Sequence, residues 1–213
     1  RKAGTIILLS TILIWFTTYF GWVDGQFRML EAMEIDHSIL AGIGSAFAWI
    51  FLPCGIGDWK SAVAVITGLV AKENVVGTLA VVYGMTNLID TEELALTGGG
   101  TEVAAIMGLT KAAALAYLMF NLFTPPCLAA LGAMNAEMQS KKWLWGGISL
   151  QFGIGFTTAF LVYQAGTLAA TGSVGAGFVP GLLAVFAMAA VVAILVRRTN
   201  RQFAVEYGMK KAA

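Results

Sequence analysis

Charged residues are scarce in this chain. Only 12% of its 213 residues are Asp, Glu, Lys or Arg, whereas soluble domains carry about 25%. Hydrophobic residues make up 58% of the sequence, and the mean hydropathy is +0.79. This shortage of charge, together with several long apolar runs, excludes a soluble domain and indicates an integral membrane protein. The net charge of +1 indicates neither a nucleic-acid partner nor an acidic one.

Cysteine and histidine are also scarce. The two cysteines, Cys54 and Cys127, lie in or beside apolar runs, so nothing supports a disulfide framework and we treat both as thiols. No Ser-His-Asp arrangement and no carboxylate pair with hydrolytic spacing stands out around the single histidine, His37. The sequence contains no GxxxxGKS or GxxxxGKT phosphate loop, which excludes that device for binding a nucleotide. We therefore predict that the chain is not an enzyme, with no catalytic or cofactor-binding residues.

About six apolar segments run through the chain. They are Thr5–Trp22, Ser38–Leu52, Ser61–Val82, Val103–Phe123, Trp143–Thr167 and Phe178–Val196. A transmembrane helix needs roughly 20 apolar residues, so the second segment, with 15, suits a tilted or re-entrant helix. The first lacks the short core and cleavage site of a signal peptide and is predicted to be a retained transmembrane helix. The predicted fold class is all-α, with residues 1–213 forming one polytopic transmembrane bundle.

Basic residues cluster at three points along the chain. These are Arg1 with Lys2, Lys141 with Lys142, and the tail from Arg197 to Lys211, whereas the loops at 24–36 and 86–93 are acidic. Lys and Arg are enriched on the cytoplasmic side of membrane proteins. Six crossings would place every basic point in the cytoplasm and both acidic loops outside. We therefore predict a multi-pass protein whose two termini are both cytoplasmic.

The segment Asn121–Cys127 (NLFTPPC) predicts a broken helix. Pro125 and Pro126 remove two backbone donors and bar a regular helix, so gate or structural roles are expected for them and for Thr124. Carbonyls freed at membrane depth occur where they line a cavity, and broken helices in transporters present their ends to ions. Cys127 begins the next helical piece, where the helix dipole favours a thiolate. It is either a ligand for a soft or borderline metal or a small packed hydrophobe.

Met134 lies seven residues after Cys127, on the same helical face two turns further on. Its thioether could lend a soft contact to a passing metal ion. The alternative is packing, because methionines in an apolar chain more often fill space than bind metals. Met134 is therefore a weaker candidate ligand than Cys127.

Lys72 and Glu73 sit side by side inside the apolar run Ser61–Val82. An ionisable side chain at mid-bilayer costs roughly 2.5–3.5 kcal/mol on insertion scales, so two adjacent ones need buried partners or a polar cavity. Glu73 is a candidate ligand for a hard or borderline cation, or a partner for a helix amino end or for Lys111. Lys72 repels cations and is expected to bind the free carbonyls of a broken helix. Asn74 adds a polar group after Glu73.

Three stretches resemble the second half of the membrane domain of the ferrous iron transporter B (FeoB) family. They are GDWKSAVAVITGLVAKENVVGTLAVVYG (57–84), FTPPCLAALGAM (123–134) and RKAGTIILLSTILIWF (1–16). The resemblance covers essentially the whole chain, and its AKE-VVGTL and TP-C blocks are fairly specific. The family pattern usually reads AKEVVVGTL, so Asn74 stands where that pattern has its first valine, and Cys54 is not part of the pattern.

The resemblance implies an Fe(II) importer of the bacterial inner membrane, in which Cys127 corresponds to the Gate cysteine and Glu73 to the AKE carboxylate. Fe(II) would be the transported ion. GTP and Mg would bind only through an amino-terminal GTPase domain, which is absent from this sequence along with the first Gate region. The implied partners are membrane lipid, those missing parts in the same or a companion chain, small FeoA-like or FeoC-like proteins and further copies in a homo-oligomer, with no nucleic acid.

Two other functions remain open. Gate-type domains also resemble membrane proteins associated with nucleoside recognition, for which Asn121, Asn135 and Gln151 could supply amide contacts. Alternatively, the chain is a non-transporting assembly subunit, and its polar groups only hold helices together.

Overall fold

The computed structural model describes residues 2–23, 25–69, 72, 74–84, 89–90, 95–96 and 106–212. Most of these residues are helical, which confirms the predicted all-α class, with two short antiparallel strand pairs in addition. In chain order the elements are α1 (Lys2–Tyr19), β1 (Phe20–Val23), β2 (Gln26–Met29), η1 (Ala32–His37), α2 (Ile39–Phe51), η2 (Leu52–Cys54), α3 (Trp59–Gly68), α4 (Asn74–Val82), β3 (Ile89–Asp90), β4 (Ala95–Leu96), α6 (Lys111–Phe123), α7 (Leu128–Met138), α8 (Lys141–Thr171) and α9 (Phe178–Ala212).

The first helix is shorter than the apolar run that encodes it. α1 ends at Tyr19, and β1 and β2 follow as an antiparallel hairpin. The prediction of a helix through Trp22 is therefore wrong at its last residues. Aromatic side chains pack well on a pleated surface, and here Phe20 stacks on Phe27 across the hairpin, with ring centroids 5.7 Å apart.

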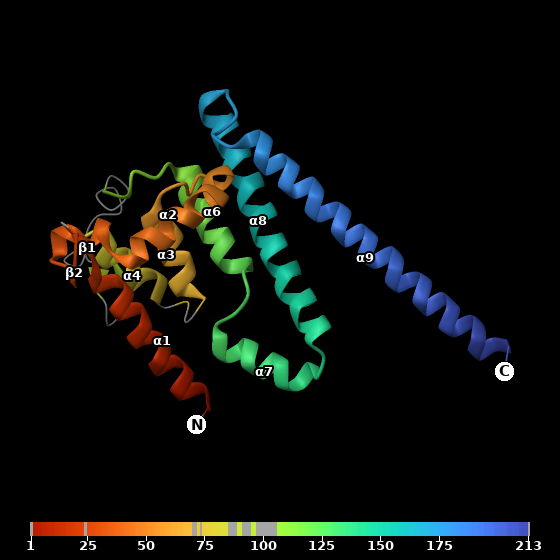
Figure 1. Cartoon of the computed structure of the whole chain (residues 1–213). Coiled ribbons are helices and arrows are strands. Elements are labelled where there is room, and N and C mark those ends of the chain that lie inside the picture. Colours follow the sequence, from red (N-terminus) through yellow and green to blue (C-terminus); the bar gives the residue numbers. More distant parts are fainter. Residues whose placement is uncertain are drawn as a thin grey trace.

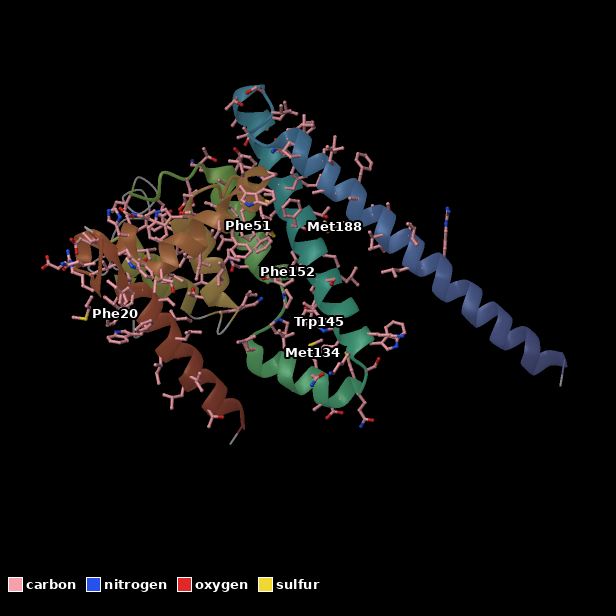
Figure 2. The ribbon with its side chains drawn as sticks, viewed as in Figure 1. Phe20, Phe51, Met134, Trp145, Phe152 and Met188 are labelled. Carbon is pink, nitrogen blue, oxygen red and sulfur yellow. The ribbon has the colours of Figure 1, made fainter. Side chains whose placement is uncertain are left out.

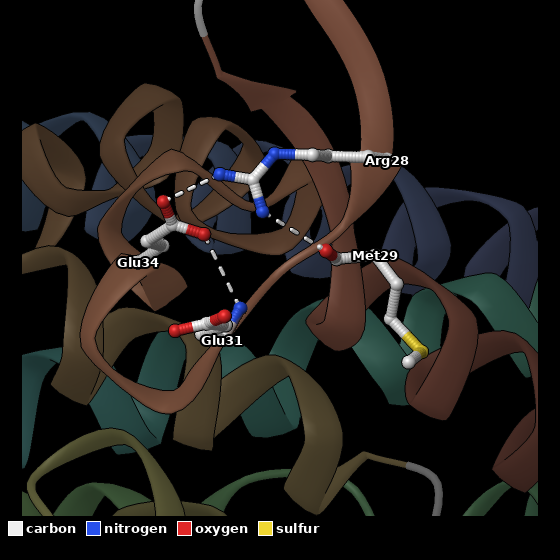
Figure 3. Close-up of polar contacts among 4 residues, drawn as sticks. All are labelled: Arg28, Met29, Glu31 and Glu34. Atoms are coloured by element: carbon white, nitrogen blue, oxygen red, sulfur yellow. Dashed lines mark hydrogen bonds and ion pairs between the residues drawn. The ribbon is translucent and has the colours of Figure 1, made fainter.

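An ion pair fixes the loop that follows this hairpin. Arg28 Nη2 donates to Oε1 of Glu34 at 2.6 Å, and Oε2 of Glu34 accepts from the backbone N–H of Glu31 at 3.3 Å (Figure 3). The hydrogen bond from Arg28 stabilises the carboxylate and lowers the pKa of Glu34. These contacts tie η1 to β2. Ser38 then caps α2, its hydroxyl accepting from the N–H of Ala41 at 3.0 Å.

α2 and α3 form a sharply bent pair. α2 is 13 residues long, which confirms the short helix predicted there, and Pro53 in η2 follows it. Asp58 starts α3 as its N-cap, accepting the N–H of Ser61 at 2.8 Å. The axes of the two helices differ by 96°.

α3 and α4 are the two arms of a helical hairpin. Ser61 Oγ of α3 lies 3.1 Å from the hydroxyl oxygen of Tyr83, just after α4. Nearer the turn, Thr67 Oγ1 lies 2.9 Å from Thr78 Oγ1. A residue early in α3 thus contacts the residue after α4, and a residue late in α3 contacts one early in α4. The two arms are therefore antiparallel, and Lys72 lies in the turn between them. The prediction that this run crosses the membrane as one helix is therefore wrong. At 1.5 Å per residue, α3 is about 15 Å long, half of a ~30 Å hydrocarbon core.

The core lies where α8 runs beside α6 (Figure 1). Phe120 of α6 and Phe160 of α8 are 1% and 2% exposed, and burying a side chain of this size contributes about 1.5–3 kcal/mol. Gly155 of α8 permits the close approach, because a Cβ atom there would lie 3.2 Å from the side chain of Thr124. Truncating Phe120 to alanine would cost about 3–5 kcal/mol.

Two of the described helices are long and apolar enough to cross a membrane alone, namely α8 and the Phe178–Arg197 part of α9. The bent α2–α3 pair makes a third if it is counted as one span. α9 touches the bundle near its start and then diverges from α8 (Figure 1), and its apolar side chains are largely exposed. The structure is thus that of a helical membrane protein. The predicted count of six crossings does not hold as made, because the run Ser61–Val82 folds back on itself, and the orientation stays a prediction.

Candidate functional site

Two interruptions in the helices lie against each other. The first joins α3 to α4, and the second joins α6 to α7. The backbone N–H of Leu128, in the second, donates to the carbonyl of Leu69, in the first, at 3.0 Å. In the other direction, the ammonium of Lys72 donates to the carbonyls of Asn121 and Thr124 at 2.6 and 3.1 Å. We call these three hydrogen bonds the break contact.

The second break lies where the sequence predicts it. α6 ends at Phe123 and α7 begins at Leu128, on either side of Pro125 and Pro126. Thr124 is extended, with φ −70° and ψ 159°, because a following proline disfavours the helical conformation. The proline-broken helix is therefore confirmed, whereas gate roles for these residues stay predictions.

Each carbonyl that Lys72 binds has lost its helical partner for an identifiable reason. In a continuing α-helix the carbonyl of Asn121 would accept from residue 125, but Pro125 has no N–H. The carbonyl of Thr124 would accept from Leu128, whose N–H donates to the first break instead. Both oxygens lie at the C-terminal end of α6, where the helix dipole favours a cation by about 0.3–1 kcal/mol at exposed positions.

Lys72 therefore contacts the groups expected for it in the sequence analysis, the free carbonyls of the broken helix. A lysine at membrane depth requires such partners, and Lys72 is half-buried at the tip of the α3–α4 hairpin. Glu73 lies outside the described residues. Asn74 begins α4, but its side chain is also outside them. The predicted roles of Glu73 and Asn74 stay predictions.

The first break was missed because no proline marks it. The nearest signal in the sequence is Gly68, the last residue of α3. A Cβ atom at this position would lie 2.4 Å from Cγ2 of Val75, so the two arms approach too closely for any side chain. A glycine four residues before the charged pair that begins at Lys72 was thus the available indication of a turn.

Cys127 lies between two residues that form hydrogen bonds of the break contact. Thr124, three residues earlier, binds Lys72, and Leu128, one residue later, binds the first break. Cys127 itself is half-buried and is the N-cap residue of α7, with its carbonyl accepting from the N–H of Leu131 at 3.0 Å. A thiol at a helix start beside a polar break is suited to bind a soft or borderline cation.

Met134 is half-buried on α7, the short helix that joins the second break to α8 (Figure 2). Within the described residues, no group of three or more His, Cys, Asp or Glu side chains could hold a metal ion. Cys127 therefore belongs to no such group of three among them. The predicted ligand set of Cys127, Glu73 and Met134 stays a prediction.

Polar side chains lie between the two arms of the α3–α4 hairpin. They occur at its outer end, where α3 begins and α4 ends, and closer to its tip, the turn that contains Lys72. At the outer end, Asp58 Oδ2 accepts from the hydroxyl of Tyr83 at 2.6 Å. The pair formed by Thr67 and Thr78 lies closer to the tip. Tyr117 of α6 is 5% exposed, and its hydroxyl has no hydrogen-bond partner among the described residues. Asp58 and Tyr83 were missed in the sequence because neither falls in a recognisable motif.

Cys54 belongs to the packed core. It is 0% exposed, and its Sγ lies 3.8 Å from the carbonyl of Phe156. A nearby apolar groove of about 500 Å³ is lined by residues that include Phe51, Phe152, Trp145 and Met188 (Figure 2). None of the break-contact residues lines this groove.

The fold and the break contact define a helical membrane protein in which a hairpin tip meets a proline-broken helix. The chain belongs to the Gate family, whose model carries the description nucleoside recognition and matches residues 1–141.

Relatives of the chain are transporters by name. The Fe(2+) transporter FeoB of Staphylococcus aureus (strain COL) is 27% identical over 173 residues, covering 79% of this chain and 23% of that protein. The Fe(2+) transporter FeoB of Campylobacter jejuni is 32% identical over 145 residues, covering 67% and 23%. The Fe(2+) transport protein A/Fe(2+) transporter FeoB fusion protein of Porphyromonas gingivalis is 27% identical over 201 residues, covering 79% and 24%. These matches confirm the resemblance to the FeoB family.

The chain spans less than a quarter of the length of the S. aureus and C. jejuni proteins. No solved structure gives a significant match.

Proposed function

We propose that this chain forms part of the membrane domain of a ferrous iron transporter and helps to move Fe(II) across the bacterial inner membrane. The observation that carries the proposal is the break contact, because it joins two interrupted helices at the position of Cys127. Interrupted helices line cavities at membrane depth and present polar groups to ions. The names of the relatives supply the identity of the cargo.

In this proposal Cys127 offers its sulfur to Fe(II) as the ion passes the second break. Glu73 supplies either an oxygen ligand or the charge that positions the gate, and Met134 adds a weaker soft contact. Lys72, Asn74, Thr124, Pro125 and Pro126 form the gate. The two breaks must separate for an ion to pass, and the three hydrogen bonds of the break contact hold them together until then.

The rest of the proposed assembly is inferred from the relatives and not from residues of this chain. We propose that a GTPase domain, which would hold GTP and Mg, and a first Gate region complete the transporter, in the same or a companion chain. The P. gingivalis fusion protein supports a partner like Fe(2+) transport protein A. A FeoC-like protein, a homo-oligomeric state and cytoplasmic termini belong to the same proposal.

The two cysteines provide a matched test of the ligand role. Cys127→Ala should lower the uptake of radiolabelled Fe(II) by roughly tenfold or more, the scale on which metal sites respond to a lost contact, while membrane insertion is unchanged. Cys54→Ala removes a thiol from the core and should leave uptake within about twofold of the wild type. Wild-type uptake by the Cys127→Ala variant would refute the ligand role.

A second candidate function is recognition of a nucleoside, which the description of the Gate family favours. Asn121 is less suited to this than its sequence suggests, because its side-chain amide already donates to the carbonyl of Tyr117 at 2.9 Å. Alkylation of Cys127 distinguishes the two cargoes. Protection by Fe(II) supports iron transport, and protection by nucleosides without protection by Fe(II) would replace it.

A further inference from the structure

We propose that the C-terminal end of α6 is a binding site for a small monovalent cation, and that the ammonium of Lys72 fills this site in the conformation described here. The site is formed by the carbonyl oxygens of Asn121 and Thr124, which lie 2.6 and 3.1 Å from Nζ of Lys72. It belongs to the backbone of α6, so it does not depend on which ion the protein transports.

Neither acceptor receives its helical backbone N–H, so without Lys72 the only donor among the described residues is the Thr124 hydroxyl, which binds the carbonyl of Asn121 at 3.2 Å. Pro125 cannot donate to Asn121, and the N–H of Leu128 is taken by Leu69. Pro125 is almost fully buried and Thr124 is 7% exposed, so the carbonyl of Thr124 lies among buried groups. Buried backbone carbonyls without a donor are costly, and such groups are rare in proteins. Without Lys72, the site therefore favours another small cation.

The chemistry of the site suits a monovalent ion. Both ligands are neutral carbonyl oxygens, and within the described residues no carboxylate lies within ion-pair distance of Lys72. In potassium channels, rings of backbone carbonyls replace the hydration shell of K⁺, and the two carbonyls here can replace part of such a shell. The negative end of the α6 dipole adds to the attraction. The preceding turn contains Phe120, which is 1% exposed, and its apolar surroundings weaken screening by water.

The hydroxyl of Thr124 also donates to the carbonyl of Asn121, at 3.2 Å. This bond ties Thr124 to the last turn of α6 and involves no atom of Lys72. The site is therefore built by α6 and its prolines, while the cation comes from the hairpin. When the hairpin tip withdraws Lys72, an ion from solution can take its place.

The test compares thermal unfolding of the full-length protein in detergent, without iron, in chlorides of potassium, ammonium and choline at one ionic strength. Lys72→Met removes the ammonium and keeps the aliphatic stem. Its Tm should be higher in potassium or ammonium than in choline by on the order of 3 °C, since a ligand that binds only the folded state stabilises it. The wild type should show no such difference, because Lys72 already occupies the site.

Two controls separate the site from general effects of charge. Lys60→Met removes a lysine whose ammonium lies 5.2 Å from the ring centre of Tyr83, at the outer end of the hairpin, and should not respond to the choice of salt. Lys72→Arg keeps a cation at the break and should behave like the wild type. Equal Tm values for Lys72→Met in all three salts would overturn the proposal. So would failure to purify that variant folded in any of them, since solution cations would then not fill the site.

Discussion

The ammonium of Lys72 lies 2.6 Å from the carbonyl oxygen of Asn121, although 49 residues separate the two along the chain. This bond joins the tip of the α3–α4 hairpin to the end of α6, and the N–H of Leu128 returns a bond to Leu69. Each break thus supplies a donor for acceptors of the other. Neither can straighten into a continuous helix without leaving unpaired groups in its partner.

Restoring the missing donor should weaken this link. Pro125→Ala supplies an N–H that can bond to the carbonyl of Asn121, in competition with Lys72. We expect α6 to extend, the amide at position 125 to gain protection from hydrogen exchange, and Fe(II) uptake to fall. Pro180→Ala is the matched control, because Pro180 lies in the first turn of α9, where no helical bond is lost. An unprotected amide at position 125 would contradict the prediction.

The close approach of the hairpin arms should not tolerate a side chain at Gly68. Gly68→Ala places a Cβ atom 2.4 Å from Cγ2 of Val75 and should lower the free energy of unfolding by about 1–3 kcal/mol. Gly77→Ala, where no atom lies within 4 Å, should be neutral or stabilising. Denaturation monitored by circular dichroism measures both. Adding Val75→Ala to Gly68→Ala should recover part of the loss, and no recovery would argue against the clash.

Two tyrosines, the partly buried Tyr83 and the buried Tyr117, should respond differently to loss of the hydroxyl. Tyr83→Phe removes a donor to the carboxylate of Asp58, a bond worth about 1.5–3 kcal/mol. Tyr117→Phe removes a hydroxyl that has no hydrogen-bond partner among the described residues, and should be neutral or stabilising. Thermal unfolding compares the two variants directly. A larger loss for Tyr117→Phe would indicate a partner for its hydroxyl and refute this assignment.

The loop held by Arg28 should lose stability in acid. Its hydrogen bond lowers the pKa of Glu34 in the folded state, so the unfolded loop binds a proton more readily. The contribution of Glu34 is complete above its unfolded pKa, near 4.5, and is lost as pH falls through the lower folded value. Hydrogen exchange at the amide of Glu31, corrected for the intrinsic rate, measures this loss. Glu34→Gln should abolish the pH dependence, and its persistence in that variant would assign it to another group.

The sequence predicted the second break well because proline acts locally. Pro125 and Pro126 end a helix whatever surrounds them, so the end of α6 and the start of α7 followed from the residues themselves, whereas α6 begins at Lys111 and not at Val103 as the apolar run suggested. Lys72 was also expected at free carbonyls, because a buried ammonium has few other partners.

The first break could not be predicted in the same way. Hydropathy registers that residues 61–82 are apolar but does not distinguish one long helix from two short ones. What decides between them is the tertiary contact of Gly68 with Val75 and the donor that Leu128 gives to Leu69. The bond from Leu128 involves a residue far from the turn in sequence. The contact of Gly68 with Val75 can be recognised only once the two arms are packed together.

The anchoring of α9 has a mechanical consequence. Gly177 and Gly181 pack against Pro53 at the start of this helix, whereas its later residues leave the bundle. A helix that is fixed at one end adjusts its tilt to the thickness of the surrounding lipid. A thinner bilayer would therefore swing α9 about Pro53 and leave the hairpin tip where it is.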